Sequence, residues 1–187
     1  MPAAFDMPLQ EMRTYAGSNP RPKDFDQFWA SALAELENTD PDVELRVADF
    51  RILNFRCLDL RFNGVGGSRV YAKVIVPEHA DGKMPAVLKF HGYSGNSGDW
   101  FDLLPFAAMG NVVAALDCRG QGGISEDRAA VGGMTWTGHI VRGLLDTPEN
   151  LYYRSVYLDT VQLARIIMAF EEVDEYKVSS TGHSQGG

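Results

Sequence analysis

The sequence lacks long apolar runs and a surplus of basic residues. No apolar run in its 187 residues approaches the roughly 18 needed to span a bilayer. The N-terminus has no basic stretch followed by an apolar one, so no secretory signal is expected. Acidic residues outnumber basic ones, 25 to 17, for a net charge of −8. This balance argues against nucleic acid as a partner and against a polybasic membrane anchor, because both need a positively charged face.

Metal ligands and disulfide partners are equally scarce. The two cysteines, Cys57 and Cys118, are far apart and suggest no disulfide framework. The four histidines show no metal-ligand spacing with one another or with cysteine. We therefore expect no metal and no cofactor, and a reduced, cytoplasmic setting.

The rest of the composition is that of an ordinary globular domain, with 45% hydrophobic and 22% charged residues. Residues 1–23 are proline-rich and aperiodic, which is typical of an extended arm. Asp24 then gives a capping signal for an amphipathic helix whose apolar residues keep helical spacing up to Leu36. We assign residues 1–40 to this arm and helix.

Alternating apolar and polar residues between 43 and 76 predict strands instead. Segments 43–47, 57–62 and 69–76 alternate with a period of two. The glycines of segment 63–68 are typical of a turn. A phosphate-binding loop is the alternative, but these glycines precede a strand rather than a helix. We expect antiparallel edge strands here.

From residue 85 to 187, strands and helices alternate, which predicts a mainly parallel α/β core within one domain. The expected elements are a strand at 86–90, a helix from 99 to 110 that Pro105 kinks or restarts, a strand at 112–117, a helix from 155 to about 171, and a strand at 176–181. The acidic residues at 171–175 are expected in a solvated turn. Residues 118–153 show little periodicity, and Trp136 and His139 in them could shape a substrate pocket or a subunit contact.

Two motifs follow expected strands. Gly182-His183-Ser184-Gln185-Gly186 has the G-x-S-x-G pattern, in which a strand ends in a sharp turn that presents a nucleophilic serine. His91-Gly92-Tyr93 follows another strand and begins a glycine-rich loop. In hydrolases with such a turn, a loop of this kind supplies a backbone N–H to the oxyanion hole. The alternative for this loop is an ordinary connection between a strand and a helix.

With Arg119-Gly120-Gln121, these motifs resemble the acetyl xylan esterase and cephalosporin C deacetylase family of carbohydrate esterases, in which R-G-Q and G-x-S-Q-G are signatures. Segments 21–29, 138–146 and 152–159 also resemble it, so the likeness covers nearly the whole chain. The resemblance implies an α/β-hydrolase fold and a serine esterase working through an acetyl-serine intermediate. It further implies a homohexamer that deacetylates xylo-oligosaccharides and cephalosporin-type esters.

The same resemblance implies roles for individual residues. Ser184 is the implied nucleophile, and the backbone N–H groups of Tyr93 and Gln185 are the implied oxyanion hole. Arg119 and Gln121 are implied to brace the loops around the site. None of these residues is expected to hold a metal.

The sequence has no histidine or aspartate after Ser184, where this fold places the rest of its triad. His91, His139 and His183 all precede the serine, the family's His-Glu signature is absent, and family members are longer. We therefore expect the N-terminal part of a longer α/β-hydrolase, incomplete at the C-terminus and inactive by itself. The alternatives are a peptidase, a dienelactone-type hydrolase, or a catalytically silent truncated module.

Overall fold

The computed structural model of the protein describes residues 7–129 and 140–187. Trp136 and His139, which the sequence suggests for a pocket or a subunit contact, lie outside these residues. The chain divides into two compact units, Met1–Ser31 and Ala32–Gly187. Among the described residues, no helix is long and apolar enough to cross a bilayer.

The first unit contains a short helix, α1 (Leu9–Met12), and the beginning of α2 (Phe25–Glu37). The predicted extended arm is therefore helical at one place. The helix expected after Asp24 is confirmed. Near its start, Arg21 forms an ion pair with Asp26, and its guanidinium lies 4.6 Å from the centre of the Phe25 ring.

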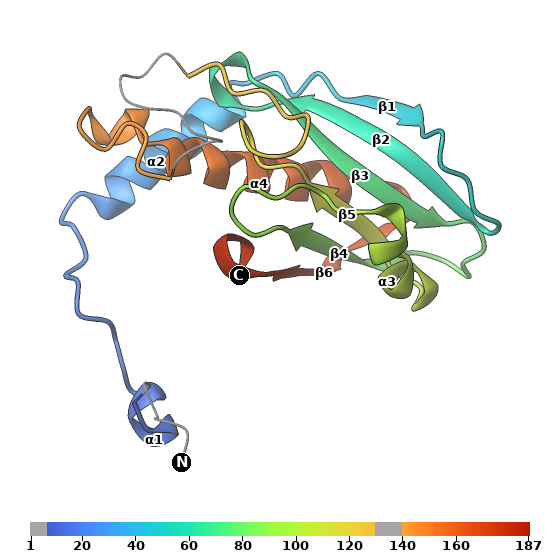
Figure 1. The fold of residues 1–187 in the computed structure, drawn as a ribbon, viewed down its shortest axis with the longest axis horizontal. Helices are drawn as coiled ribbons and strands as arrows, with labels where there is room; N and C mark the ends of the chain where they lie inside the picture. The colour runs from blue at the N-terminus through green and yellow to red at the C-terminus, as the bar shows by residue number, and fades with distance from the viewer. Residues whose placement is uncertain (1–6, 130–139) are drawn as a thin grey trace. The chain divides into compact units, whose positions relative to one another are not determined.

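The second unit is built on one sheet with the strand order β1-β2-β3-β5-β4-β6 (Figure 1). Its strands are β1 (Glu44–Val47), β2 (Phe55–Asn63), β3 (Arg69–Pro77), β4 (Met84–Phe90), β5 (Val112–Leu116) and β6 (Val173–Gly182). The first three pair antiparallel and β3 pairs antiparallel with β5, whereas β4 lies parallel to both β5 and β6. This confirms the predicted antiparallel edge and parallel core.

Helices on opposite faces explain why β5 is buried throughout. Its residues alternate between faces: Val112 and Ala114 pack in the apolar cluster that contains Leu163 of α4 (Tyr152–Met168). Val113 packs in a second cluster, with Ala107 of α3 (Leu104–Ala108). A strand covered on both faces needs apolar residues at every position, as the sequence of β5 has.

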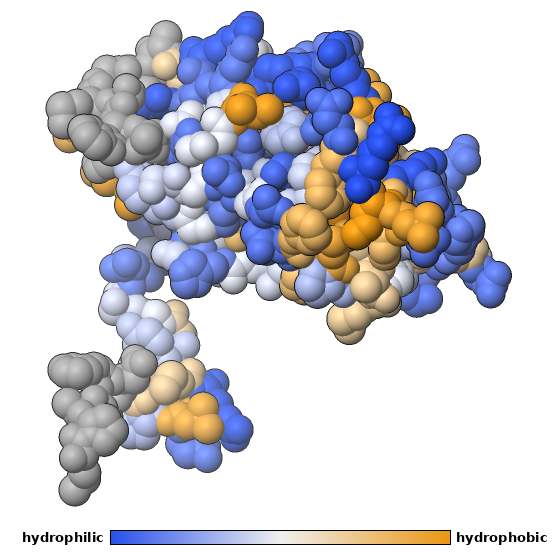
Figure 2. Space-filling view, turned by 45° about the vertical axis from the view of Figure 1, so that its right-hand side comes forward, coloured by the Kyte–Doolittle hydropathy of each residue, from blue (hydrophilic) through white to orange (hydrophobic). Residues whose placement is uncertain are grey.

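The turn signals act as the sequence indicates. The side chain of Asp99 accepts a hydrogen bond from the backbone N–H of Phe101, beginning the short 3₁₀ turn Trp100–Asp102. Pro105 lies in the first turn of α3, where a missing N–H costs little, so it restarts the helix. Gly110 ends this segment with a φ of +82°. The face shown in Figure 2 is mostly hydrophilic, and its largest group of apolar residues lies toward the right-hand side.

Several element boundaries differ from expectation, among them the starts of α4 and β6. Helix α4 begins at Tyr152 rather than at 155, because the Tyr152 ring is buried and its hydroxyl donates a hydrogen bond to the carbonyl of Arg119. Strand β6 begins at Val173 rather than at 176, because Val173 is buried and pairs with Met84. The prediction of a solvated turn is therefore wrong for Asp174 and Glu175, which lie within β6.

Leu163 tests the contribution of α4 to the core. Its side chain is 0% exposed, and Leu163→Ala is expected to lower the free energy of unfolding by about 2–5 kcal/mol through lost burial and a residual cavity. Leu53, 84% exposed, is the matched control, and Leu53→Ala should change stability by less than about 0.5 kcal/mol. Urea denaturation of the full-length protein measures both, and equal losses would contradict this packing.

Candidate active site

Ser184 occupies a sterically demanding turn at the end of β6. Its φ is +54°, in the left-handed region that residues other than glycine rarely adopt. A Cβ at Gly182 would collide with the carbonyl oxygen of Gly186, and one at Gly186 would collide with that of Phe90. The motif thus needs both glycines, because the backbone passes too close to Gly182 and Gly186 for a side chain at either position. The turn leaves Ser184 exposed.

Parallel pairing brings the loop after β4 to this serine. Phe90 pairs with Leu116 of β5 and with Gly182 of β6, so the three strands end at the same edge of the sheet. A Cβ at Gly92 would lie 3.5 Å from Cβ of Ser184. The peptide that joins Gly92 to Tyr93 therefore runs directly beside the serine.

Gln121 joins the segments that follow β4 and β6. Its Oε1 accepts a hydrogen bond from the backbone N–H of Ser94 at 2.9 Å. Its Nε2 lies 2.9 Å from Oε1 of Gln185 and 3.1 Å from the hydroxyl of Tyr152, and donates to both. One buried side chain thus contacts the neighbours of Tyr93 and of Ser184.

Arg119 is buried behind these loops rather than exposed to solvent. Its guanidinium makes two hydrogen bonds of 2.6 Å to the carboxylate of Asp159 on α4, a bidentate pair. It also donates to the carbonyl of Val65 and the hydroxyl of Ser68, each at 3.3 Å. Burial lowers the pKa of Arg119, but Asp159 outweighs this and the pKa is raised overall, so Arg119 stays charged.

The Tyr152 hydroxyl joins the backbone of Arg119 to the side chain of Gln121, which in turn contacts Gln185. The Tyr152 hydroxyl donates to the carbonyl of Arg119 at 2.6 Å and lies 3.2 Å from the Cys118 sulfur. Burial raises the pKa of the Cys118 thiol to about 11 and also raises the pKa of Tyr152. Both groups are therefore protonated at neutral pH.

Sequence reasoning missed Tyr152 and Asp117. Tyr152 lies in segment 118–153, which shows little periodicity, so no local pattern indicates that its side chain is a hydrogen-bonding centre. The carboxylate of Asp117, just after β5, accepts from the backbone N–H groups of Ser97 at 2.6 Å and Ile124 at 2.8 Å. An acidic residue directly after a wholly apolar strand was the available signal. Asp117 ties the loop after β4 to the loop after β5.

The sequence-derived site residues fall into two groups. Ser184, Gln185, Tyr93 and Gln121 come together at one edge of the sheet, while Arg119 lies buried beneath them.

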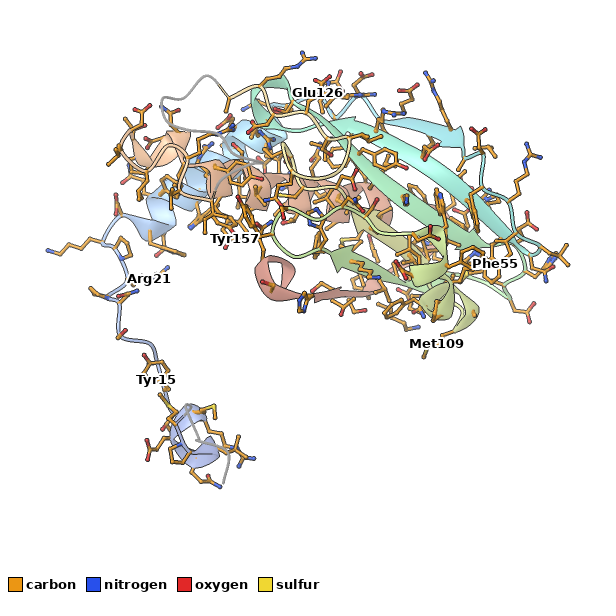
Figure 3. The ribbon with its side chains drawn as sticks, in the orientation of Figure 1. Tyr15, Arg21, Phe55, Met109, Glu126 and Tyr157 are labelled. Carbon is orange, nitrogen blue, oxygen red and sulfur yellow. The ribbon has the colours of Figure 1, made fainter. Side chains whose placement is uncertain are left out.

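A cavity of about 300 Å³, lined by Gln185 and by Tyr157 of α4 among others, lies next to the turn; Figure 3 shows Tyr157 near the C-terminal end. Within the described parts of the chain, no cluster of three or more His, Cys, Asp or Glu side chains could hold a metal ion.

Known proteins resemble this chain in sequence and in overall structure. The family model for acetyl xylan esterase (AXE1) matches residues 1–187. The chain belongs to the acetyl xylan esterase family. Its structure is similar to that of acetyl xylan esterase 1 from Thermoanaerobacterium sp. JW/SL YS485, with 51% sequence identity and a TM-score of 0.91. That match covers 97% of this chain and 57% of the Thermoanaerobacterium chain.

A second family structure, the acetyl xylan esterase from Paenibacillus sp. R4, is 34% identical, with a TM-score of 0.87. The match covers 96% of this chain and 58% of that chain, so the chain spans 57–58% of the length of these two relatives. A Bacteroides fragilis protein, 14% identical with a TM-score of 0.62, shares the fold over 86% of this chain and 46% of its own. The chain therefore has the α/β-hydrolase fold, and it contains part of that fold.

The buried ion pair beneath the site can be tested by a double-variant cycle. Arg119→Met leaves the Asp159 carboxylate buried without its partner, which should lower the free energy of unfolding by about 3–5 kcal/mol. Combining it with Asp159→Leu should cost less than the sum of the two single changes. Arg46→Met, at an exposed ion pair with Glu44, is the control and should leave the transition unchanged. Additive losses in urea denaturation would contradict the pairing.

Proposed function

We propose that the protein is a serine esterase that removes acetyl groups from acetylated xylo-oligosaccharides and from cephalosporin-type esters. The observation that carries the proposal is the position of Ser184, exposed in a turn with positive φ and beside the Gly92–Tyr93 peptide. Family membership supports the substrate class, since the Thermoanaerobacterium and Paenibacillus relatives are named acetyl xylan esterases.

In this proposal the hydroxyl oxygen of Ser184 attacks the carbonyl carbon of the acetyl group while a histidine takes its proton. The backbone N–H groups of Tyr93 and Gln185 stabilise the negative oxygen of the tetrahedral intermediate. The sugar hydroxyl leaves with the proton from the histidine, and water then hydrolyses the acetyl-serine. Because this fold places aspartate and histidine after the serine, we assign both to residues of the full-length protein that follow Ser184.

Gln121 and Arg119 have supporting roles in this mechanism. Gln121 bonds to Ser94 and Gln185, and so holds the two segments that carry the proposed oxyanion donors at a fixed separation. Arg119 anchors the loop that presents Gln121, through its ion pair with Asp159. Donors held in place before the reaction need no reorganisation when the negative charge develops. The homohexamer and the cytoplasmic setting stay predictions.

Ser184→Ala in the full-length protein tests the function. Acetate release from acetylated xylo-oligosaccharides should fall by a factor on the order of 10⁶, because the variant has no nucleophile. Ser179→Ala, on the same strand but outside the cavity beside the turn, is the matched control and should retain the parent's rate. Deacetylation by Ser184→Ala at the parent's rate would rule out the mechanism. Hydrolysis of a peptide or a dienelactone in place of the acetyl ester would favour the other hydrolase classes.

A further inference from the structure

His91 makes two hydrogen bonds that connect the loop after β4 with the end of β5. The backbone N–H of Cys118 donates to its Nε2 at 2.9 Å. Its Nδ1 lies 2.7 Å from the carbonyl oxygen of Gly92, the next residue in the chain. The imidazole therefore bridges two segments that parallel pairing brings to the same edge of the sheet.

These two partners allow only one form of the ring. A backbone N–H can only donate, so Nε2 must carry no proton and accept the bond from Cys118. A carbonyl oxygen can only accept, so Nδ1 must carry the proton and donate to Gly92. The neutral imidazole protonated on Nδ1 satisfies both contacts, whereas the other tautomer and the charged ring each lose at least one.

The Gly92 carbonyl is also the closing point of a tight turn. It accepts the backbone N–H of Gly95 at 3.0 Å, while Ser94 within the turn has a φ of +58°. A Cβ at Gly95 would lie 3.1 Å from Nδ1 of His91 and 3.0 Å from the Gly92 oxygen. Because Gly95 has no side chain, the His91 ring can lie against the turn that contains Tyr93.

We propose that His91 is a positioning residue: its neutral ring fixes the Gly92–Gly95 turn against the backbone of Cys118, and thereby sets the position of the Tyr93 N–H. This inference rests on the proposed function, in which that N–H stabilises the oxyanion. His91 does not exchange protons with the substrate. It works alongside Gln121, which binds Ser94 in the same turn from the following loop.

Kinetics of His91 variants of the full-length protein test the proposal. His91→Ala removes both bonds, and kcat for acetyl-ester hydrolysis should fall about 10- to 100-fold, because a displacement of about 1 Å can cost that much. KM should stay unchanged, since the oxyanion contact forms only in the transition state. His91→Gln, whose side-chain oxygen can accept from the Cys118 N–H, should recover most of the lost kcat.

His79→Ala is the matched control, because His79 is exposed on the loop between β3 and β4. It should have the parent's kcat and KM. A kcat for His91→Ala equal to the parent's would overturn the proposal, as would a His91→Gln variant no better than His91→Ala. If His91→Ala does not fold, the comparison of His91→Gln with the parent decides: a kcat near the parent's supports the proposal, and a loss of 10-fold or more overturns it.

A spectroscopic measurement separates this inference from the proposed function. In the ¹⁵N NMR spectrum of the imidazoles at neutral pH, assigned by comparison with His91→Gln, the Nδ1 of His91 should carry the proton and Nε2 should not. A proton on Nε2 would overturn the proposed role of His91, whether or not the protein hydrolyses acetyl esters. If the full-length protein shows no acetate release that depends on Ser184, the proposed function fails, and this spectrum still decides whether His91 holds the turn.

Discussion

Parallel pairing of β4 with both β5 and β6 decides where the loops of the candidate site lie. It aligns Phe90 with Leu116 and Gly182, so that segments far apart in the sequence begin at one edge of the sheet. In α/β folds this edge, at the carboxyl ends of the strands, is where ligands bind. The pairing is stabilised by apolar clusters on both faces of the sheet, under α4 and under α3.

Apolar burial brings the loops together, but polar contacts fix how they lie. Gln121 contacts segments after two different strands, and the Arg119–Asp159 pair anchors the loop that carries Gln121. A hydrogen bond between uncharged groups, such as those of Gln121, contributes only about 0.5–1.5 kcal/mol, whereas an uncharged buried partner left without its bond costs about 1–3 kcal/mol. The loops therefore depend on one another. A change in one of them is expected to displace the segments beside Ser184 and not only its own backbone.

The sequence predicts the order of strands and helices and the position of Ser184, because apolar periodicity and the glycine motif are local signals. It does not predict the starts of α4 at Tyr152 and of β6 at Val173, since long-range burial decides both. The sequence likewise does not predict the pairing of Arg119 with Asp159, because no local pattern around either residue indicates the other. The sequence also gave no sign that His91, which precedes the serine, holds the neighbouring turn.

We propose that the turn after β6 makes Ser184 the reactive serine. Ser94 is the informative comparison, because it lies in the adjacent loop and also has a positive φ. To test this directly, the full-length protein is treated with a fluorophosphonate, which modifies activated serines. The modified residue is then identified by peptide mass spectrometry. We expect a single adduct, on Ser184. An adduct on Ser94, or no adduct on either serine, would contradict it.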